Sequence, residues 1–521
     1  MRLIPLALVA GAIFAVLLVG SLKRQTGRSE QVQELKRKYA RKHVPSVDHK
    51  KFTILQKKFA SAHDVTPACI SCHTERHKEV MASTHWNWSR EVYLPGRGVR
   101  TIGKKNLLNN FCIGVSSNLQ GCSKCHAGYE YVDNGFDFTE PRNIDCLVCH
   151  DNSGTYTKTT AGLPSPDVDL NLVAQRVGPP QRANCGTCHF FGGGGNNVKH
   201  GDLEQALMST GRDVDVHMGT DGADLDCVAC HTARNHKMLG KMYSVSSMNH
   251  DRSSCEQCHG AAPHTDSLLN EHTVKVACQT CHIPVYAKVS ETKLAWDWST
   301  AGKLRDGKPY EIEDADSNPT YASIKGTFTW GKNVRPDYIW FNGTADHYLL
   351  GDTVQPGTPV KINTLHGSYD DPASKIIPVK VHRAKQIYDP VNKILIQPKL
   401  VGTRKGEGAF WQDFDWNTAA AEGMKSVGLP YSGRYGFIDT VMYWPVNHMV
   451  ATKDKTVGCV ECHTKDNSRL AGLGGFYMPG RDRNPAIEWL GTLALAGSLG
   501  GALLHAAARI VSSQKRRAAQ A

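Results

Sequence analysis

The sequence predicts a mainly α-helical chain with long irregular loops, a small mixed α/β insert and an apolar helix at each end. The pattern Cys-x-x-Cys-His occurs eight times, and residues 69–282 hold seven of the copies. That stretch offers roughly 30 residues per motif, too few to build an ordinary apolar core. Residues 291–444 contain no Cys and carry strand-like runs, while an apolar segment stands near each end.

The repeated motif is typical of covalent c-type haem attachment. Two thiols at this spacing can each bond one vinyl group of a haem, and the adjoining imidazole binds the iron. Cys-x-x-Cys also occurs at zinc and thiol redox sites, but neither requires the His that follows in all eight copies. We therefore predict eight c-type haems that serve as the core around which the loops wrap. The motif residues are Cys69, Cys72 and His73; Cys122, Cys125 and His126; Cys146, Cys149 and His150; Cys185, Cys188 and His189; Cys227, Cys230 and His231; Cys255, Cys258 and His259; Cys278, Cys281 and His282; and Cys459, Cys462 and His463.

Composition restricts the partners. Of 17 Cys, sixteen belong to the motifs, so Cys112 stands alone and no thiol pair remains for a disulfide. The formal charge of +12 does not predict a nucleic-acid partner, because each ferric haem with two propionates brings about one negative charge. Haem attachment of this type takes place outside the cytoplasm. We predict a periplasmic protein, or one on the outer face of the cytoplasmic membrane.

Both ends of the chain predict contact with a bilayer. Residues 1–24 are predicted to form a membrane anchor or an uncleaved signal. Residues 25–65 are predicted to form a basic stalk, with His43, His49 and His63 as surface residues. Residues 486–512 read as a C-terminal membrane helix, followed by basic residues that favour the cytoplasmic side. His505 in this helix either ligates a haem or faces a partner helix. The expected partner is a b-type cytochrome or another quinol-linked membrane protein.

The middle of the chain divides into three parts. We assign residues 66–290 to a seven-haem region, 291–445 to a haem-free insert and 446–482 to a segment around the eighth haem. Runs at 327–330, 338–341 and 376–381 predict strands that brace the haem array and wall a substrate channel. The four glycines at 192–195 predict close approach of the backbone to a cofactor.

A haem that only transfers electrons usually takes a second strong ligand, most often His. Sixteen of the 24 His lie outside the motifs. His77, His250, His347, His366 and His382 are held in reserve, and His382 alternatively lines an anion pocket. The predicted distal ligands are His85, His200, His217, His236, His264, His272 and His448.

Seven distal ligands leave one haem whose outer position is open for chemistry. Cys112 stands ten residues before Cys122, and Lys199 follows the glycine run. A neutral lysine can bind iron, and burial beside a cation favours the neutral form. Alone, Cys112 would read as a small buried hydrophobe and Lys199 as a surface cation.

Several runs outside the motifs carry a family resemblance. They include Asn109–Gly114, Asp145–Asp151, Gly192–Asp202, Trp296–Thr300 and Met442–Val450. Over residues 66–482 the chain resembles the octahaem tetrathionate reductase family. The resemblance implies that the second haem has His126 as proximal ligand, Lys199 in place of a distal His, and Cys112 beside it. Asn196 stands where the family has an acidic residue, and an amide cannot deliver a proton.

These observations predict a reductase of tetrathionate, nitrite or hydroxylamine that takes a small anionic substrate. Lys199, released from iron and protonated, would stabilise the oxyanion. Cys112, Asn196 and His382 are the other catalytic candidates. Two alternatives remain open: an electron conduit in which every iron is saturated, and an enzyme that oxidises hydroxylamine. The sequence also leaves a calcium site open.

Overall fold

The computed structural model describes residues 45–240 and 251–519. The chain divides into two compact units, Met1–Val457 and Gly458–Ala521, and each is considered by itself. The boundary lies inside the predicted eighth-haem segment, so residues 446–457 pack with the larger unit. The predicted anchor at 1–24 and most of the predicted stalk lie outside the described residues.

The described chain is a mixture of helix and sheet, which corrects the mainly α prediction. Most helices are single turns, because each haem motif needs only one turn to bring its thiols together. The short two-stranded sheets are β1 (Arg90–Leu94) with β2 (Gly98–Ile102) and β3 (Ala233–Arg234) with β4 (Lys237–Met238). The helices are α2 (Thr53–Gln56), α3 (Ala62–Ile70), α4 (Arg76–Met81), α5 (Thr84–Asn87), α6 (Leu119–Cys122), α7 (Leu147–His150), α8 (Leu170–Gln175), α9 (Arg182–His189), α10 (Cys227–Cys230), α11 (Glu256–His259), α12 (Ser267–His272), α13 (Cys278–His282), α14 (Phe410–Asp413), α15 (Trp416–Ser426), α16 (Cys459–Cys462) and α17 (Pro485–Ala518).

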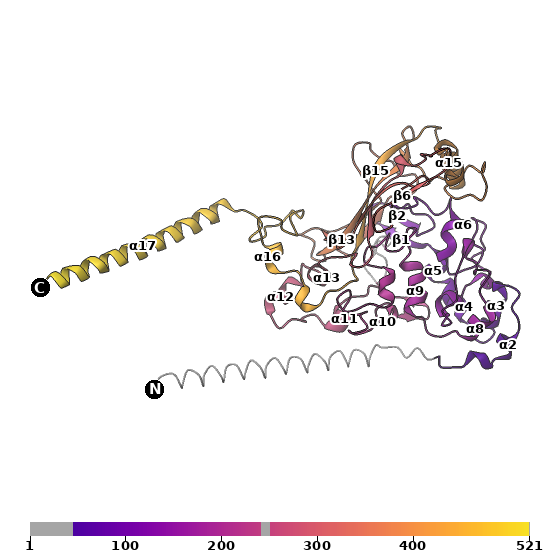
Figure 1. Ribbon diagram of the computed structural model, residues 1–521, viewed down its shortest axis with the longest axis horizontal. Coiled ribbons are helices and arrows are strands. Elements are labelled where there is room, and N and C mark those ends of the chain that lie inside the picture. Colours follow the sequence, from indigo (N-terminus) through magenta and orange to yellow (C-terminus); the bar gives the residue numbers. More distant parts are fainter. Residues whose placement is uncertain (1–44, 241–250, 520–521) are drawn as a thin grey trace. The chain divides into compact units, whose positions relative to one another are not determined.

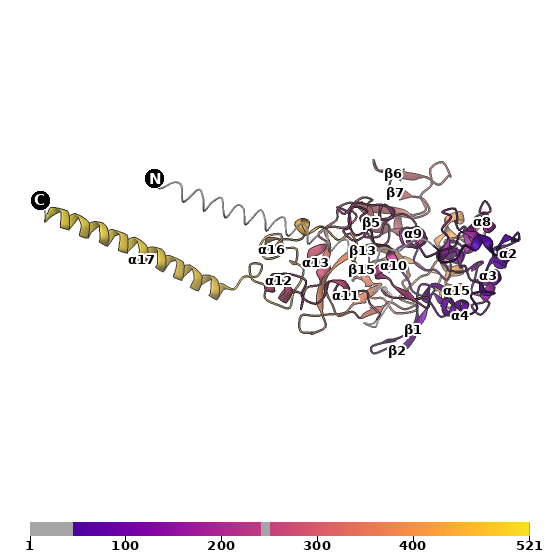
Figure 2. The same ribbon diagram turned by 90° about the horizontal axis from the view of Figure 1, so that it is seen from below.

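Each motif coincides with a helical turn. In a helix, residues three and four apart lie on one face, so two Cys at i and i+3 and the His at i+4 project to the same side. Helices α7, α9, α10, α11 and α13 all end within or at such a motif. Figures 1 and 2 show α9, α10, α11 and α13 gathered beside β13.

The predicted insert contains a nine-stranded sheet, much larger than the small insert expected. Its order is β11-β15-β13-β5-β8-β7-β6, with β9 and β14 also paired to β13. The three runs predicted as strands lie in β8, β9 and β13. The strands are β5 (Thr292–Asp297), β6 (Glu311–Glu313), β7 (Pro319–Ala322), β8 (Gly326–Gly331), β9 (Asp337–Phe341), β11 (Val360–Lys361), β13 (Lys375–Asp389), β14 (Ile394–Leu395) and β15 (Gly436–Pro445), while β10 (Ala345–His347) pairs with β12 (Asn363–Leu365).

The largest apolar core packs the sheet against α14 and α15. Trp298 is fully buried there, Trp416 stacks on Phe410 with ring centroids 3.7 Å apart, and Phe111 reaches in from the motif region. The motif region itself contains smaller apolar clusters. Ordinary side-chain packing therefore stabilises the insert, and the motif helices are held against it.

The segment after residue 48 is packed rather than a solvated stalk. Leu55 and Val65 are buried in a cluster with Leu147 and Val173. Asn171 Nδ2 donates a hydrogen bond to Leu55 O, which holds α2 against α8. The prediction of a stalk over 25–65 is therefore wrong for this part of it, because its apolar residues match a surface formed by α7 and α8.

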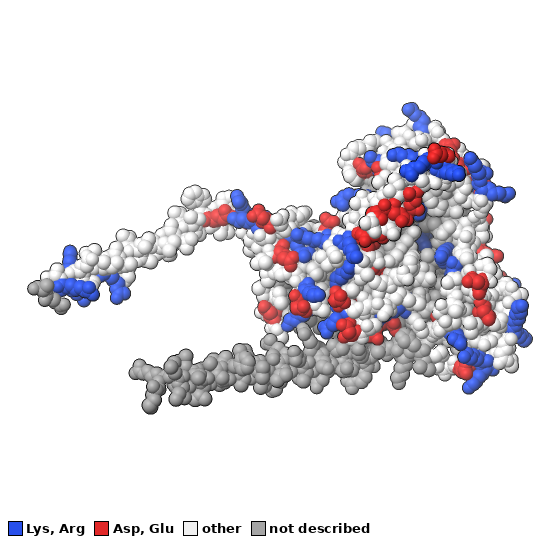
Figure 3. Space-filling view, viewed as in Figure 1, with Lys and Arg blue, Asp and Glu red and all other residues white. Residues whose placement is uncertain are grey.

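The smaller unit contains α16 and the 34-residue α17. Helix α17 is long and apolar enough to cross a membrane, and none of its side chains is buried. Figure 3 shows it as a nearly uncharged rod with basic residues toward the C-terminal end. Its start is fixed by Asn484, whose side chain caps Ile487 N, and by Pro485 in the first turn.

Replacing Trp298 tests the role of the insert. Its indole Nε1 donates to Phe111 O at 3.0 Å and so attaches the Cys112 loop to the sheet. We expect Trp298→Ala to lower the free energy of unfolding by about 3–5 kcal/mol, and Trp298→Phe to lower it by about 1–3 kcal/mol through the unpaired carbonyl. Denaturant melts followed by far-ultraviolet circular dichroism measure both. Trp489→Ala on exposed α17 is the control, and an equal loss there would contradict this assignment.

Candidate functional site: a haem cavity with one lysine position

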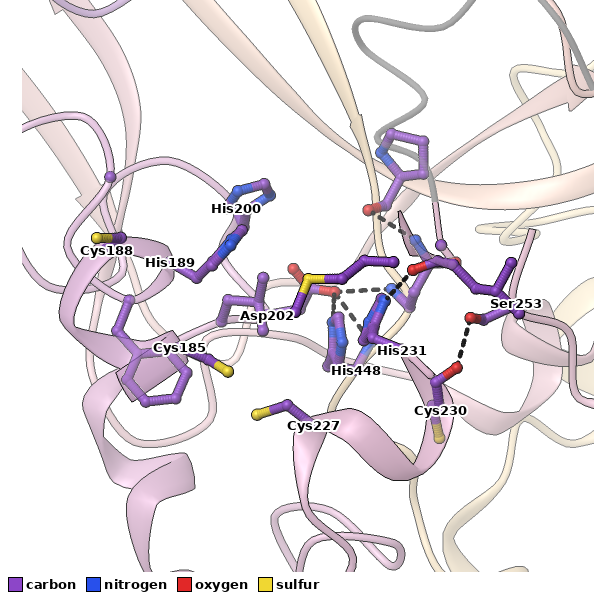
Figure 4. A pocket seen from close by; sticks show the side chains of 18 of the residues that line it. Cys185, Cys188, His189, His200, Asp202, Cys227, Cys230, His231, Ser253 and His448 are labelled. Carbon is purple, nitrogen blue, oxygen red and sulfur yellow. Dashed lines mark hydrogen bonds and ion pairs between the residues drawn. The ribbon is translucent and has the colours of Figure 1, made fainter. Parts of the chain in front are cut away.

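A connected cavity of about 2660 Å³ runs through the larger unit. Pockets for one small ligand measure about 300–1,000 Å³, so this volume suits several flat cofactors. Figure 4 shows thiols and imidazoles of the fourth and fifth motifs grouped around a part of it. The motif cysteines on its wall are Cys122, Cys125, Cys149, Cys185, Cys188, Cys227, Cys230, Cys255, Cys258 and Cys278.

Six motif imidazoles each face a second imidazole at a nearly constant spacing. Two nitrogens that each lie about 2 Å from one metal ion place their ring centres about 6 Å apart. The observed spacings are 6.0–6.4 Å. The arrangement therefore fits iron held between two imidazoles. The pairs are His73 with His49, His150 with His236, His189 with His85, His231 with His448, His259 with His217, and His282 with His264.

Hydrogen bonds at Nδ1 orient many of these rings. The Nδ1–H of His150 donates to Gly178 O at 2.9 Å, and that of His231 donates to Leu239 O at 3.1 Å. An Nδ1 held in this way turns Nε2 toward the metal and fixes the tautomer. His236, His264 and His448 bond through Nδ1 to Glu79, Asn270 and Asp202, and His272 and His463 bond to Leu268 O and Pro479 O.

Buried carboxylates that the sequence analysis did not single out position two of the distal rings. Asp202 accepts hydrogen bonds from the backbone N–H of Asn447 and His448 and from the His448 ring. Its charge raises the pKa of His448, although burial opposes this. Asp215 accepts from His217 N and Met449 N, so it joins two ligand segments far apart in sequence. Figure 4 shows Asp202 beside His448.

The predicted distal set changes at two positions. The structure places His85, His217, His236, His264 and His448 opposite a motif ring, as the pairs above show. His49, assigned to the surface from sequence, lies opposite His73 at 6.4 Å. His200 instead lies edge-on to Trp444 at 5.0 Å, and no described motif imidazole faces it at the ligand spacing. His272 as a ligand remains a prediction.

The second motif differs from the others. His126 is fully buried among Trp86, Trp88, Tyr131, Phe136 and Phe138. Its Nε2 bonds to Trp86 O at 2.5 Å, and its Nδ1 has no partner. Burial lowers its pKa to about 3, so the ring is neutral. The atom that would bind iron is already occupied and the ring does not line the cavity, so the structure departs from the expectation that His126 is the proximal ligand.

The backbone around His126 is fixed by a buried ion pair. Lys158 Nζ donates to His126 O at 2.6 Å and lies 2.8 Å from Asp145 Oδ2. Asp145 also accepts hydrogen bonds from Tyr129 and Tyr156. A network in which every member is satisfied resists rearrangement. The inward turn of His126 is therefore part of the packed structure rather than a mobile side chain.

Lys199 supplies a nitrogen at this part of the cavity. Its amine lies over the Trp444 ring, 4.7 Å from the centroid, and the side chain lines the cavity wall. Desolvation and the charge of Lys104 lower its pKa to about 7, while Cys125 of the second motif opposes the shift. A Cβ at Gly192 would lie 3.2 Å from Lys199 Cδ. The first glycine of the run thus leaves space for the lysine chain.

A second buried lysine holds this segment from behind. Lys380 on β13 donates to Val198 O, Lys199 O and Thr292 Oγ1 at 2.8, 3.1 and 2.6 Å. Burial lowers its pKa well below the usual value. Sequence reasoning missed Lys380, because a Lys in a strand-like run predicts an exposed face. The only available signal was that Lys380 is the one charged residue in the otherwise apolar run of residues 376–381.

The other catalytic candidates divide. Cys112 lines the cavity, interacts electrostatically with Cys122, and has its pKa raised by burial. Asn196 does not line that cavity; its amide bonds to Ser290 Oγ and to Gln205 N. His382 does not line the cavity either, and its ring packs against Phe111 with ring centroids 4.6 Å apart. The structure therefore places Cys112 at the predicted site and moves Asn196 and His382 away from it.

Close approach between motif sulfurs indicates which motifs are neighbours. Cys69 contacts Cys146, Cys125 contacts Cys188, Cys185 contacts Cys227, and Cys255 contacts Cys278. Cys149 with Cys185, and Cys230 with Cys258, are close enough to interact through charge. The motifs therefore run in the order first, third, fourth, fifth, sixth, seventh, and the second adjoins the fourth.

Metal clusters of another kind are absent from the part of the chain that the structure describes. Residues 45–240 and 251–519 contain no group of three or more His, Cys, Asp and Glu able to hold a metal ion. Neither the zinc alternative nor the calcium site left open by the sequence has a ligand cluster there. Instead, Cys and His of the fourth to seventh motifs line one cavity together with cysteines of the second and third, as haem attachment requires.

Comparison with known proteins decides the family. A crystal structure of octaheme cytochrome c from Shewanella oneidensis matches with a TM-score of 0.78 and 42% identity, covering 84% of this chain and 98% of that chain. The chain belongs to the octahaem c-type cytochromes of the tetrathionate reductase family. A family model described as bacterial cytochrome c matches residues 293–466 of this cytochrome. An uncharacterized protein of Archaeoglobus fulgidus is 23% identical over 247 residues, 37% of this chain and 80% of that protein.

Membership of this family supports covalently bound c-type haems and a multihaem redox function for this cytochrome. It is an oxidoreductase in the general sense. The imidazole pairs fit this assignment without adjustment, and the second motif stands apart from them.

His49 offers a test of the imidazole pairs. We expect His49→Ala to convert one low-spin haem of the oxidised holoprotein to high spin, because His73 would keep no partner. Electron paramagnetic resonance measures the change. His63→Ala is the matched control, since His63 contacts Tyr129 and Glu130 and faces no motif ring. A low-spin spectrum in the His49 variant would show that this ring binds no iron.

Proposed function

We propose that this octahaem cytochrome reduces small oxyanions of sulfur or nitrogen at the haem of the second motif. Tetrathionate, nitrite and the related substrate hydroxylamine are the candidates. One observation carries the proposal: His126 Nε2 is bonded to Trp86 O, whereas the amine of Lys199 faces the cavity beside Cys125. When bound, the haems supply electron transfer and an iron centre with an open position.

Lys199 can act in two protonation states near neutral pH. Its pKa of about 7 makes a neutral, ligating amine accessible without strong base. The cationic form attracts an anion and stabilises charge that develops on it. The Trp444 face stabilises the same cation. Lys199 therefore either holds the metal or binds the oxyanion, and the environment leaves both states close in free energy.

Cys112 completes the pocket on the insert side. Its loop is held by Asn110, whose amide donates to His382 O and accepts from Gln386 and Thr440. Burial keeps the Cys112 thiol protonated, because it raises the pKa. A protonated thiol shapes the pocket and donates a weak hydrogen bond rather than attacking a sulfur–sulfur bond. We therefore assign Cys112 to substrate positioning.

The location of the protein follows from the same proposal. Outside the cytoplasm, α17 would anchor the cytochrome in a membrane, and its exposed apolar surface suits lipid or a partner helix. A b-type cytochrome or another quinol-linked protein would supply the electrons. Membrane fractionation of a chain truncated after residue 484 checks this anchor. The full-length cytochrome should be in the membrane fraction and the truncated one in the soluble fraction.

Lys199 makes iron ligation at the second motif depend on pH. The pKa in the protein lies below the usual value, so the neutral amine is present above about pH 7 and is lost as pH falls. Iron binding competes with the proton and moves the transition lower. We expect the ligand-sensitive absorption bands of this haem to change at or below pH 7 in the oxidised holoprotein. Lys199→Gln should lack this pH-dependent change, and a pH titration identical to that of the wild type would contradict lysine ligation.

Turnover assays separate the reductase from its rivals. With a reduced artificial donor, the wild-type protein should reduce at least one of tetrathionate, nitrite and hydroxylamine, and Cys112→Ser should raise KM more than it lowers kcat. Lys199→Gln should lower kcat by about 10²-fold or more, as loss of one oxyanion-stabilising group does. Absence of turnover with all three substrates would leave an electron conduit. Turnover of hydroxylamine only with an artificial electron acceptor would indicate an enzyme that oxidises hydroxylamine.

A further inference from the structure

A second cavity lies on the sheet side of the glycine run. It measures about 480 Å³, within the range of small-ligand sites. Strands β5 and β8 form part of its wall through Lys293, Phe328 and Trp330. Gly194, Gly195 and Lys325 line both this cavity and the haem cavity. The two spaces are thus separated by a wall that contains two residues without side chains.

Lys293 is the unexplained group in this cavity. The residue is 4% exposed, its amine makes no hydrogen bond or ion pair among the described residues, and Glu311 acts on it only through longer-range electrostatics. The amine lies 3.5 Å from the Phe328 ring centroid, 4.1 Å from Trp296 and 4.9 Å from Trp330. A buried ammonium is normally paired with a counter-charge. Aromatic faces replace part of the lost hydration but supply no counter-charge.

The aromatic rings around Lys293 are held rigidly. Trp296 Nε1 donates to Lys325 O at 2.7 Å, and Trp330 Nε1 donates to Pro319 O at 2.7 Å. Trp296 also stacks on Trp298 with centroids 4.8 Å apart. The indole N–H groups are therefore used elsewhere, and the ring faces remain turned toward the amine. The cage is preorganised around an amine whose pKa burial and the charge of Lys325 lower to about 7, and an anion bound beside it would favour the charged form.

The charges around the cavity favour an anion at its inner end. Lys325 interacts with both Lys293 and Cys112, so the two amines and the thiol lie near the shared wall. Lys332, Glu311 and Asp316 also line the cavity. Glu291 is engaged by Asn318, whose amide donates to it at 2.6 Å. A small oxoanion would satisfy the unpaired amines, whereas a cation would meet both lysines.

We propose that this second cavity binds a small oxoanion on Lys293 and Lys325, next to the wall that it shares with the haem cavity. Its role in delivering anions to Lys199 rests on the proposed function, while binding itself does not. The glycine run adds a reason for the position: a Cβ at residue 194 would meet nothing within 4 Å, so this residue faces open space between the other lining residues. The cavity would raise the local anion concentration beside the reactive pocket.

Selenate is a suitable probe, because it is an oxoanion whose selenium scatters anomalously. Crystals of the oxidised holoprotein soaked in selenate should show a selenium peak in contact with Lys293 Nζ. Isothermal titration calorimetry should show that selenate also binds the same protein in solution. Lys293→Met removes the charge, and a thioether packs well against aromatic rings, so the fold should persist. Selenate binding should then be lost. Lys293→Arg should restore it, and Lys308→Met, an exposed lysine that lines neither cavity, should leave it unchanged.

Kinetics test delivery separately. Lys293→Met should raise KM for the reducible oxyanion about tenfold with kcat unchanged, as expected when one charge-assisted contact outside the reaction centre is lost. No selenium peak at Lys293 in the wild type, or the same peak in Lys293→Met, would overturn the site. A peak that depends on Lys293 in a protein that turns over no oxyanion would support the site while overturning the proposed function. An unchanged KM in the variant would overturn delivery.

Discussion

The structure depends on one geometric requirement: each ligating imidazole must present Nε2 to a metal from a fixed direction. Nδ1 hydrogen bonds to carbonyls and carboxylates meet this requirement at His150, His231 and His448. Because the partners come from segments far along the chain, satisfying each ring also ties loops together. Asp202 and Asp215 do this most clearly, since Asp202 binds Asn447 and His448, and Asp215 binds both its own loop and Met449. Short helices suffice when such contacts and the cofactors provide the core.

The exception at the second motif follows from the same chemistry. His126 uses Nε2 rather than Nδ1 in its hydrogen bond, and five aromatic rings enclose it. An imidazole committed in that way cannot also bind iron. A primary amine has no second nitrogen to orient and a long flexible chain, which suits the two roles proposed for Lys199. Lys380 fixes only its backbone, and that leaves the amine free to move.

Sequence reasoning recovered what is encoded locally. The motifs are local by nature. Of the five predicted histidines that the structure places opposite a motif ring, four lie within the motif-rich span and His448 stands just ahead of the eighth motif. His49 was missed because its basic surroundings resemble a solvated segment, yet Leu55 and Val65 beyond it are buried. The orientation of His126 depends on Trp86, forty residues earlier, and on the Lys158–Asp145 pair, so no pattern around the motif reveals it. The size of the sheet was underestimated because β13 pairs with strands spread over 150 residues.

The order of thiol contacts has a consequence for how the molecule handles current. The second motif touches the fourth, while the fourth also continues to the third and fifth. The second motif, which is the proposed reaction site, is therefore a side branch of the series that runs from the first motif to the seventh. Blocking this branch leaves the series intact, so electrons would still pass along it while the proposed chemistry is inhibited.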